Sequence, residues 1–178
     1  MAKTIRFKFA PKKAYAAILW MISQRPNIDL HTMLKACYFA DKKHLNEYGR
    51  PVFGATYKAM KFGPVPLEIY EMAKSEPLWL SELEVEVYPW TLNGYRLCLT
   101  NNEGPSEEDL AESDWEALAE GFEKSSSMNF NARTSATHGI DWQRANLGRM
   151  KYEDMFDDVV GSNEKIAYLK ESAPFIRV

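Results

Sequence analysis

The sequence predicts an α+β fold: a mainly helical single domain with a small antiparallel β-sheet. Two long apolar stretches, residues 14–22 and 30–48, carry the spacing of buried helices. The pair Asn93-Gly94 lies between residues that alternate in polarity, which is a strong hairpin signal. No internal repeat or low-complexity linker divides the chain, so we expect residues 1–178 to form one domain.

The first helix is expected between Pro11 and Arg25. Proline suits the first helical turn, and Pro26 pushes Arg25 out of helical geometry. The basic start followed by residues 14–22 superficially resembles a secretory signal. However, residues 23–26 are not the small residues of a cleavage site, and the run is about half of the ~20 residues needed to cross a bilayer. We therefore expect a buried helix.

The second helix is expected to begin after Asp29, a good capping residue, and to end at Gly49. Asp41 falls on its apolar stripe. A carboxylate in that position needs a hydrogen-bond or charge partner. The simplest interpretation is a buried acid that ties down a neighbouring loop.

The middle of the chain predicts short strands and one helix. Alternation over residues 55–62 predicts a strand near residues 55–61. Residues 63–66 are expected to interrupt it. The apolar spacing of residues 67–74 predicts a helix. Alternation over residues 83–88 predicts a half-buried strand.

The hairpin at Asn93-Gly94 is expected to pair Leu92 with Tyr95 and Trp90 with Leu97. That pairing puts even-numbered residues on the apolar face, whereas residues 83–88 have odd-numbered apolar positions. We therefore predict a bulge or break near Pro89, which cannot donate a ladder hydrogen bond.

The second half of the chain is expected to be helical. Capping-box patterns begin at Ser106 and Ser113, and the run 125–127 ends the second of these helices. The predicted helices are residues 114–123, 131–137 and 163–172. Residues 144–161 give no clear pattern.

Charge and cysteine content restrict the function classes. The chain has 22 basic and 25 acidic side chains, a net charge of -3, which gives no general attraction to nucleic acid or to an anionic membrane. Lys58 and Lys61 beside Tyr57 and Phe62 form only one basic and aromatic patch, so nucleic-acid binding is disfavoured. Two cysteines are too few for a disulfide framework and fit a reducing cytoplasm.

Local charge is uneven. Residues 3–13 carry only basic charges, and residues 103–123 carry only acidic ones. Such runs usually form solvated faces, and the acidic run is alternatively a surface for a basic partner.

Motifs for chemistry are missing from the sequence. Cys37 and His44 are too far apart along a helix to touch, and no close pair of cysteine or histidine ligands predicts a metal. The spacings of phosphate-binding glycine loops do not occur. We expect no catalytic residue, no metal and no cofactor.

Two long blocks resemble a known family. Residues 34–51, LKACYFADKKHLNEYGRP, are similar to the signature of the Panacea domain, or SocA-like antitoxin, family, and residues 54–66, GATYKAMKFGPVP, to its second block. Thr137-His138, followed by Trp142, resembles the family's short C-terminal motif. The likeness covers about residues 14–145, which leaves 146–178 as a C-terminal helical extension. Partner choice is expected in that extension or in the basic N-terminal segment.

The resemblance implies an antitoxin, often from a phage or prophage. It would neutralise a cognate protein toxin by direct binding that blocks the active site or substrate access. Toxins of this family's members include alarmone-synthetase-like proteins. The alternative is a proteolytic adaptor that delivers the toxin to a Clp-type protease. A third hypothesis, a hydrolase or nucleic-acid modifier, would use His44, His138 and Asp41.

The family's motif positions supply the candidate partner-binding residues. Gly63 and Pro64 are interpreted as setting backbone geometry. The candidates for partner binding are Asp41, His44, Tyr57, Lys61, Tyr70, His138 and Trp142.

Overall fold

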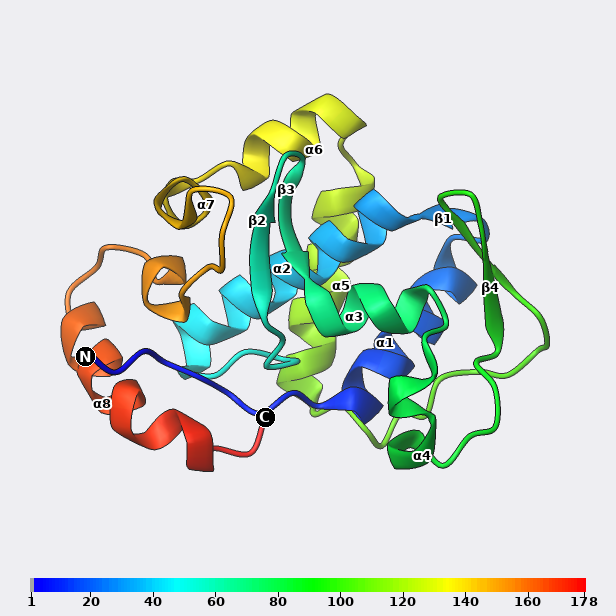
Figure 1. The fold of residues 1–178 in the computed structure, drawn as a ribbon, viewed down its shortest axis with the longest axis horizontal. Helices are drawn as coiled ribbons and strands as arrows, with labels where there is room; N and C mark the ends of the chain where they lie inside the picture. Colours follow the sequence, from blue (N-terminus) through cyan, green and yellow to red (C-terminus); the bar gives the residue numbers. More distant parts are fainter. Residues whose placement is uncertain (1) are drawn as a thin grey trace.

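Helix α2 runs through the middle of the molecule and the other elements surround it (Figure 1). The computed structural model describes residues 2–178. The α-helices are α1 Pro11–Gln24, α2 Leu30–Tyr48, α3 Leu67–Ala73, α4 Leu80–Leu83, α5 Glu112–Ser126, α6 Phe130–Thr137, α7 Ile140–Ala145 and α8 Ser162–Ser172. The strands are β1 Ile28–Asp29, β2 Tyr57–Met60, β3 Gly63–Pro66, β4 Trp90–Asn93 and β5 Arg96–Leu99. Short 3₁₀ turns are η1 Pro77–Trp79, η2 Tyr152–Met155 and η3 Ala173–Phe175. The predicted fold class is confirmed.

Both ends of α2 follow the sequence prediction. Asp29 caps the helix by accepting hydrogen bonds from the Thr32 backbone N–H and hydroxyl, at 2.9 and 2.7 Å. Gly49 ends the helix in the left-handed conformation at φ 75°, with its N–H on the Leu45 carbonyl. Between these ends nearly every residue from 30 to 41 is buried, so α2 forms the centre of the core.

Helix α5 approaches α2 very closely at one glycine. A methyl group placed on Gly121 would lie 2.6 Å from the Ala36 carbonyl oxygen and 2.9 Å from the Ala40 nitrogen. Only a residue without a side chain lets the two helix backbones come this near.

The first helix is buried as predicted. Pro11 opens α1, and Arg25 leaves helical geometry at φ −137°. Residues Ala14 and Ala16 to Leu19 have at most 1% of their surface exposed to solvent. None of the helices within residues 2–178 combines the length and apolar character required to cross a membrane.

Two small sheets flank the helices. One has the order β1-β5-β4, and the other is the antiparallel hairpin β2–β3. The strand predicted near residues 55–61 is confirmed as β2, but residues 63–66, expected only to interrupt it, form β3 and pair back onto β2. Both prolines are tolerated there since β3 is an edge strand. Gly63, at φ 108°, makes the tight return possible.

The predicted register of the second hairpin is wrong by two residues. Leu92 pairs with Leu97, and Trp90 pairs with Leu99, so Gly94 and Tyr95 form the turn. Strand β5 also pairs with β1, with Ile28 opposite Leu97. The register is therefore fixed by burial of Leu97 between two neighbouring strands, which the local turn signal does not contain.

The predicted strand at residues 83–88 is also wrong. Leu83 ends α4, Glu84 is left-handed at φ 58°, and Val87 is 75% exposed. Among the described residues no strand pairs with this segment, so its alternation has no partner to stabilise it. Strand β4 begins at Trp90, so the described chain has no strand directly before Pro89 in which the predicted bulge or break could occur.

The helix start predicted at Ser106 is wrong. The helix predicted over residues 114–123 is confirmed as α5, but its cap position is Ala111 and not Ser113. Residues 107–110 form turns and bends, and α5 begins at Glu112. The Asp114 carboxylate accepts the Ala111 N–H at 3.0 Å and thereby closes the first turn. Ser113 instead directs its hydroxyl to His44. The helix ends at Ser126, within the serine run that predicted its end.

The helices predicted at residues 131–137 and 163–172 are confirmed as α6 and α8, each beginning one residue earlier. Between α7 and α8, the unassigned stretch contains η2. The N-terminal segment runs beside α8 and the C-terminus (Figure 1). Its Lys3 pairs with Glu171, and its Ile5 N–H bonds to Glu153. The basic segment is therefore fastened to the C-terminal part of the chain.

Candidate functional site

The seven residues suggested by the sequence lie in separate places. Asp41 and Tyr57 form the first place, in the interior. Asp41 Oδ1 accepts the N–H groups of Val52 and Phe53 at 2.8 and 2.9 Å, and Oδ2 accepts the Tyr57 hydroxyl at 2.7 Å. The prediction that Asp41 ties down a neighbouring loop is confirmed.

Burial governs the protonation of both groups. Asp41 is completely enclosed, and removal from water raises its pKa to about 7. The hydrogen bonds from Phe53, Tyr57 and Val52 act in the opposite direction. Burial and the neighbouring Asp41 raise the pKa of Tyr57, which keeps its hydroxyl protonated as a donor.

His44 belongs to a second, charged cluster. Its Nδ1 lies 2.7 Å from the Arg50 carbonyl oxygen, and its Nε2 lies 2.9 Å from the Ser113 hydroxyl. Burial lowers the pKa of His44. The neutral ring therefore carries its proton on Nδ1, donates to the carbonyl, and accepts the Ser113 proton at Nε2.

Asp114 is the acid of that cluster. It accepts hydrogen bonds from Lys13 at 2.7 Å and from Arg50 at 2.9 Å, and Oδ1 also lies 3.3 Å from His44 Nε2. Burial would raise the pKa of Asp114, but the bonds from Lys13 and Arg50 hold it below the ordinary value. This cluster joins α1, α2 and α5. Asp114 belongs to the acidic run 103–123, so one member of that run is buried inside the protein.

His138 and Trp142 form the third place. Their rings stack at a centroid distance of 3.7 Å with 9° between the planes. Trp142 Nε1 donates to the Met60 carbonyl oxygen at 2.8 Å, which fixes α7 to the tip of β2. Beside them the buried Asp141 accepts the Tyr38 hydroxyl at 2.5 Å.

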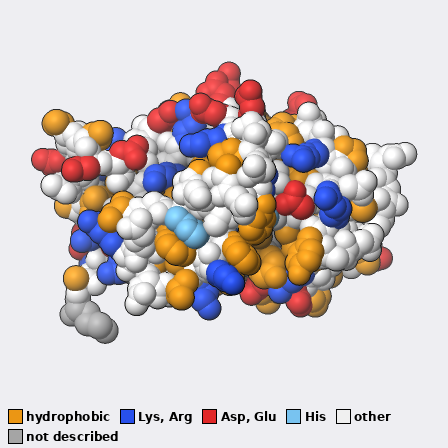
Figure 2. Space-filling view, turned by 90° about the horizontal axis from the view of Figure 1, so that it is seen from above, with side chains coloured by type: hydrophobic (Ala, Val, Ile, Leu, Met, Phe, Trp, Pro, Cys, Tyr) orange, Lys and Arg blue, Asp and Glu red, His pale blue; other side chains and the backbone are white. Residues whose placement is uncertain are grey.

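Lys61 and Tyr70 lie in the fourth place, the lining of a large hollow that we call the basic pocket. The pocket has a volume of about 850 Å³. It lies among the N-terminus of α2, the tip of the β2–β3 hairpin and the start of α6. Its basic side chains are Arg25, Lys35, Lys61, Arg96 and Arg133, and its aromatic ones are Phe62, Tyr70, Tyr95 and Phe130. Hydrophobic side chains gather next to Lys and Arg side chains on the face seen from above (Figure 2).

Two cations of this pocket are buried. Lys35 is 2% exposed and Arg133 is 4% exposed. Lys35 Nζ donates to the Pro64 carbonyl oxygen at 2.7 Å, and Arg133 donates to the carbonyls of Ser125 and Met128. Burial, and to a lesser degree Arg133, lowers the pKa of Lys35 to about 7.

His31 completes the floor of the pocket. Arg133 lies 2.9 Å from its Nδ1, and an arginine can only donate, so Nδ1 is unprotonated. The proton is therefore on Nε2, which faces the Phe62 carbonyl oxygen at 3.2 Å. Burial, together with the charges of Lys35 and Arg133, lowers the pKa of His31 to about 4, consistent with this neutral ring.

Sequence reasoning missed Lys35, His31 and Arg133. Lys35 carried a usable signal, because it is a charged residue inside the otherwise apolar run 33–40. His31 and Arg133 carried none. They are 102 residues apart, and only the packing of α6 against α2 brings them together.

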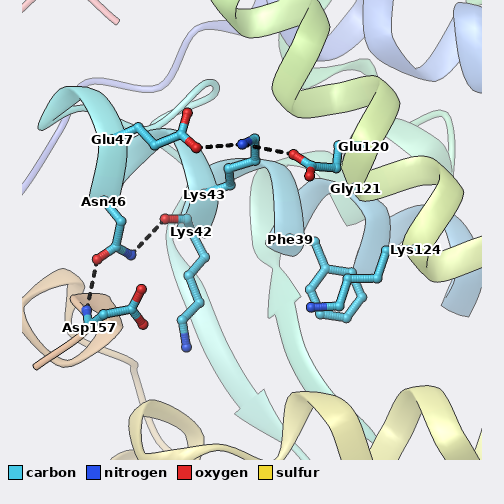
Figure 3. Close-up of a pocket in the computed structure, with 9 residues that line it drawn as sticks. All are labelled: Phe39, Lys42, Lys43, Asn46, Glu47, Glu120, Gly121, Lys124 and Asp157. Carbon is cyan, nitrogen blue, oxygen red and sulfur yellow. Dashed lines mark hydrogen bonds and ion pairs between the residues drawn. The ribbon is translucent and has the colours of Figure 1, made fainter.

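A smaller groove of about 430 Å³ lies between α2 and α5 (Figure 3). Lys43 bridges Glu47 and Glu120 across it, at 2.5 and 2.8 Å, and the Lys124 ammonium lies 4.4 Å from the centre of the Phe39 ring. These charged groups already have partners within the groove. The basic pocket is therefore the better candidate for binding a ligand.

Within residues 2–178, no three His, Cys, Asp or Glu side chains are grouped so that they could hold a metal ion.

Comparison with known protein families shows which family the chain resembles. Residues 33–143 match the family described as "Antitoxin SocA-like, Panacea domain". No curated protein and no solved structure matches the chain. The matched region contains Asp41, His44 and Tyr57 with their internal partners, and it ends within α7. Because the match covers more than half of the 178 residues, this chain belongs to the Panacea domain family of SocA-like antitoxins.

Proposed function

We propose that the chain is an antitoxin that neutralises a cognate protein toxin by binding it directly, so that the toxin's active site or substrate access is blocked. The observation that carries this proposal is the family match over residues 33–143. Among possible toxins, an alarmone-synthetase-like protein is the first to test, because the sequence resembles antitoxins that act on such toxins.

The internal bonding of the motif residues supports a binding role. Asp41, His44 and Tyr57 are buried, and their polar atoms bond to other groups of this chain. In that arrangement they stabilise a scaffold. Residues outside these bonds are then available for contact with a partner, and discrimination between partners requires features that differ among relatives.

For the contact surface we propose the exposed side of α7 and the loop that follows it. Ile140 is 52% exposed and Leu147 is 59% exposed. The half-buried His138 and Trp142 lie beside Ile140 in sequence, and Trp142 is anchored to β2. Apolar side chains presented on a fixed support are suited to a protein interface, where aromatic anchors contribute most of the binding energy.

The test is co-expression with the protein encoded by the adjacent reading frame. We expect the chain alone to be harmless, to restore growth in the presence of the toxin and to co-purify with it in a stable complex. Ile140→Glu with Leu147→Glu should abolish rescue. Leu78→Glu is the matched control, because Leu78 is 66% exposed and lies in η1, directly before α4 at the opposite end of the molecule. Rescue without any complex would overturn direct binding.

The alternative is a proteolytic adaptor. In that case the toxin would disappear over time, and only in cells that contain the protease. Direct neutralisation instead predicts rescue with unchanged toxin abundance when the Clp-type proteases are deleted. Immunoblotting of the toxin in both strains separates the two mechanisms.

A further inference from the structure

The basic pocket has positive charge without a matching negative charge. Five Lys or Arg side chains line it, and Asp29 is its one acidic residue. Asp29 directs both carboxylate oxygens to Thr32 in capping α2. Asp29 keeps its negative charge in this role and favours the charged form of Arg133, but it is one carboxylate among five basic side chains.

The two buried cations lack a carboxylate partner. No salt bridge within residues 2–178 includes Lys35 or Arg133. The Lys35 ammonium has three N–H donors, and among the described residues it makes one hydrogen bond, to the Pro64 carbonyl. A buried charge is costly unless it is paired, and two basic side chains lie close together in this pocket without a carboxylate at salt-bridge distance. An anion from outside would supply the pairing.

The entrance of the pocket has a different chemistry. Phe62, Phe130 and Tyr95 are 47%, 43% and 80% exposed, and the Phe62 and Phe130 rings meet edge to face with centroids 5.1 Å apart. Exposed aromatic rings provide stacking surfaces for nucleobases. The volume of about 850 Å³ falls in the range of small-molecule sites.

We propose that the basic pocket binds a nucleoside phosphate, with the phosphates against Lys35 and Arg133 and the base against the aromatic rings at the entrance. A folded protein surface is a poorer fit, because the cations that need an anion lie at the floor of a hollow. An acidic protein segment is retained as an outcome of the test. The proposal concerns a site separate from α7 and does not depend on toxin neutralisation.

The experiment is isothermal titration of the purified full chain with ADP, GDP and UDP. Pyrophosphate and the matching nucleosides are titrated in parallel to separate the contributions of the two parts of the ligand. We expect at least one nucleoside diphosphate to bind at least ten times more tightly than pyrophosphate and than its own nucleoside. Lysine and arginine contacts to phosphate and stacking of the base would both be needed for this result.

Variants connect binding to the pocket. Lys35→Met and Phe62→Ala should each weaken binding by about tenfold or more, the loss expected from one charged or stacking contact. Arg25→Gln is added because Arg25 lines the pocket but is exposed, so its replacement leaves the core unchanged; it should weaken binding as well. Lys12→Gln removes an exposed charge outside the pocket and should change the affinity by less than twofold.

Three results would overturn the proposal. One is the lack of any measurable binding of the three nucleotides up to about 1 mM. Another is equal affinity for pyrophosphate and nucleotides, which would mean that the pocket takes any anion. The third is tight binding of a synthetic acidic peptide, four glutamates and a tryptophan, that the nucleotides do not displace. Growth rescue by the antitoxin is measured separately, so failure of either idea is visible without the other.

Discussion

The Tyr57 hydroxyl donates a 2.7 Å hydrogen bond to Oδ2 of Asp41 in a part of the interior that water does not reach. Asp41 is on α2 and Tyr57 begins β2, so this bond joins the central helix to the hairpin that borders the basic pocket. The other oxygen of Asp41 holds the chain at Val52 and Phe53. One carboxylate therefore sets the path of the whole connection between helix and hairpin.

Asp41→Ala is expected to destabilise the protein by about 3 kcal/mol or more, because it leaves two backbone N–H groups and a hydroxyl buried without an acceptor. Urea denaturation followed by circular dichroism measures the change. Tyr57→Phe is the milder comparison, since it removes only one of the three donors. A loss below about 1 kcal/mol for the alanine variant would contradict the role assigned to Asp41.

Asp41 should also make stability depend on pH. Its pKa is about 7 in the folded protein against 3.8 ordinarily, so between these values the folded state holds a proton that the unfolded chain releases. Stability from this group is therefore greatest below pH 4 and falls as pH rises toward 7. Asp41→Asn is neutral throughout and keeps an acceptor. Relative to it, the wild type should lose up to about 1.4 kcal/mol per pH unit in that window. Parallel stability curves from pH 4 to 7 would refute this prediction.

Gly121→Ala is expected to destabilise the protein by roughly 1–3 kcal/mol through overpacking. In an unconstrained helix interior the same change stabilises by about 1 kcal/mol, so the sign of the effect is informative. The reason is the contact of a new methyl group with the backbone of Ala36 and Ala40. Gly104→Ala is the control, because nothing lies within 4 Å of its added methyl group. Thermal melting of both variants gives the comparison.

Asp114→Ala should cost roughly 3–5 kcal/mol, the effect of removing one partner from a buried ion pair. Lys13 and Arg50 would lose the carboxylate that joins them. Since the folded-state pKa of Asp114 is lowered, its contribution is present above the ordinary value and is lost as the pH falls below about 4. Glu116→Ala, an exposed member of the same acidic run, should change stability by less than about 0.5 kcal/mol. Similar losses for the two variants at pH 7 would exclude a special role for Asp114.

Lys35→Met is expected to stabilise the protein near neutral pH while it weakens binding at the basic pocket. The lowered pKa, about 7 against 10.5, means that the unfolded chain binds a proton that the folded protein releases. Wild-type stability from this group therefore rises as the pH increases from 7 toward 10. The advantage of the methionine variant should be largest at pH 6 to 7 and shrink by pH 9. Denaturation curves at these pH values test it, and an advantage that grows with pH would contradict the prediction.

The sequence alone determined the features that depend on neighbouring residues. Asp29 and Gly49 fixed the ends of α2, Pro11 fixed the start of α1, and the polar residue on an apolar stripe identified Asp41 as buried and bonded. The two motif blocks also determined the family, which the match over residues 33–143 confirmed. In each case the information lies within one helix or one continuous block, so reading along the chain recovers it.

Only the tertiary structure decided what depends on distant segments. The register of β4 and β5 follows from the pairing of β5 with β1, and residues 83–88 form no strand because none lies beside them. The basic pocket combines side chains from α2, the β2–β3 turn and the start of α6. The charge of Lys35 is visible in the sequence. That it is buried beside Arg133 without a carboxylate is set by the packing of α6 on α2, because long-range contacts leave no local pattern.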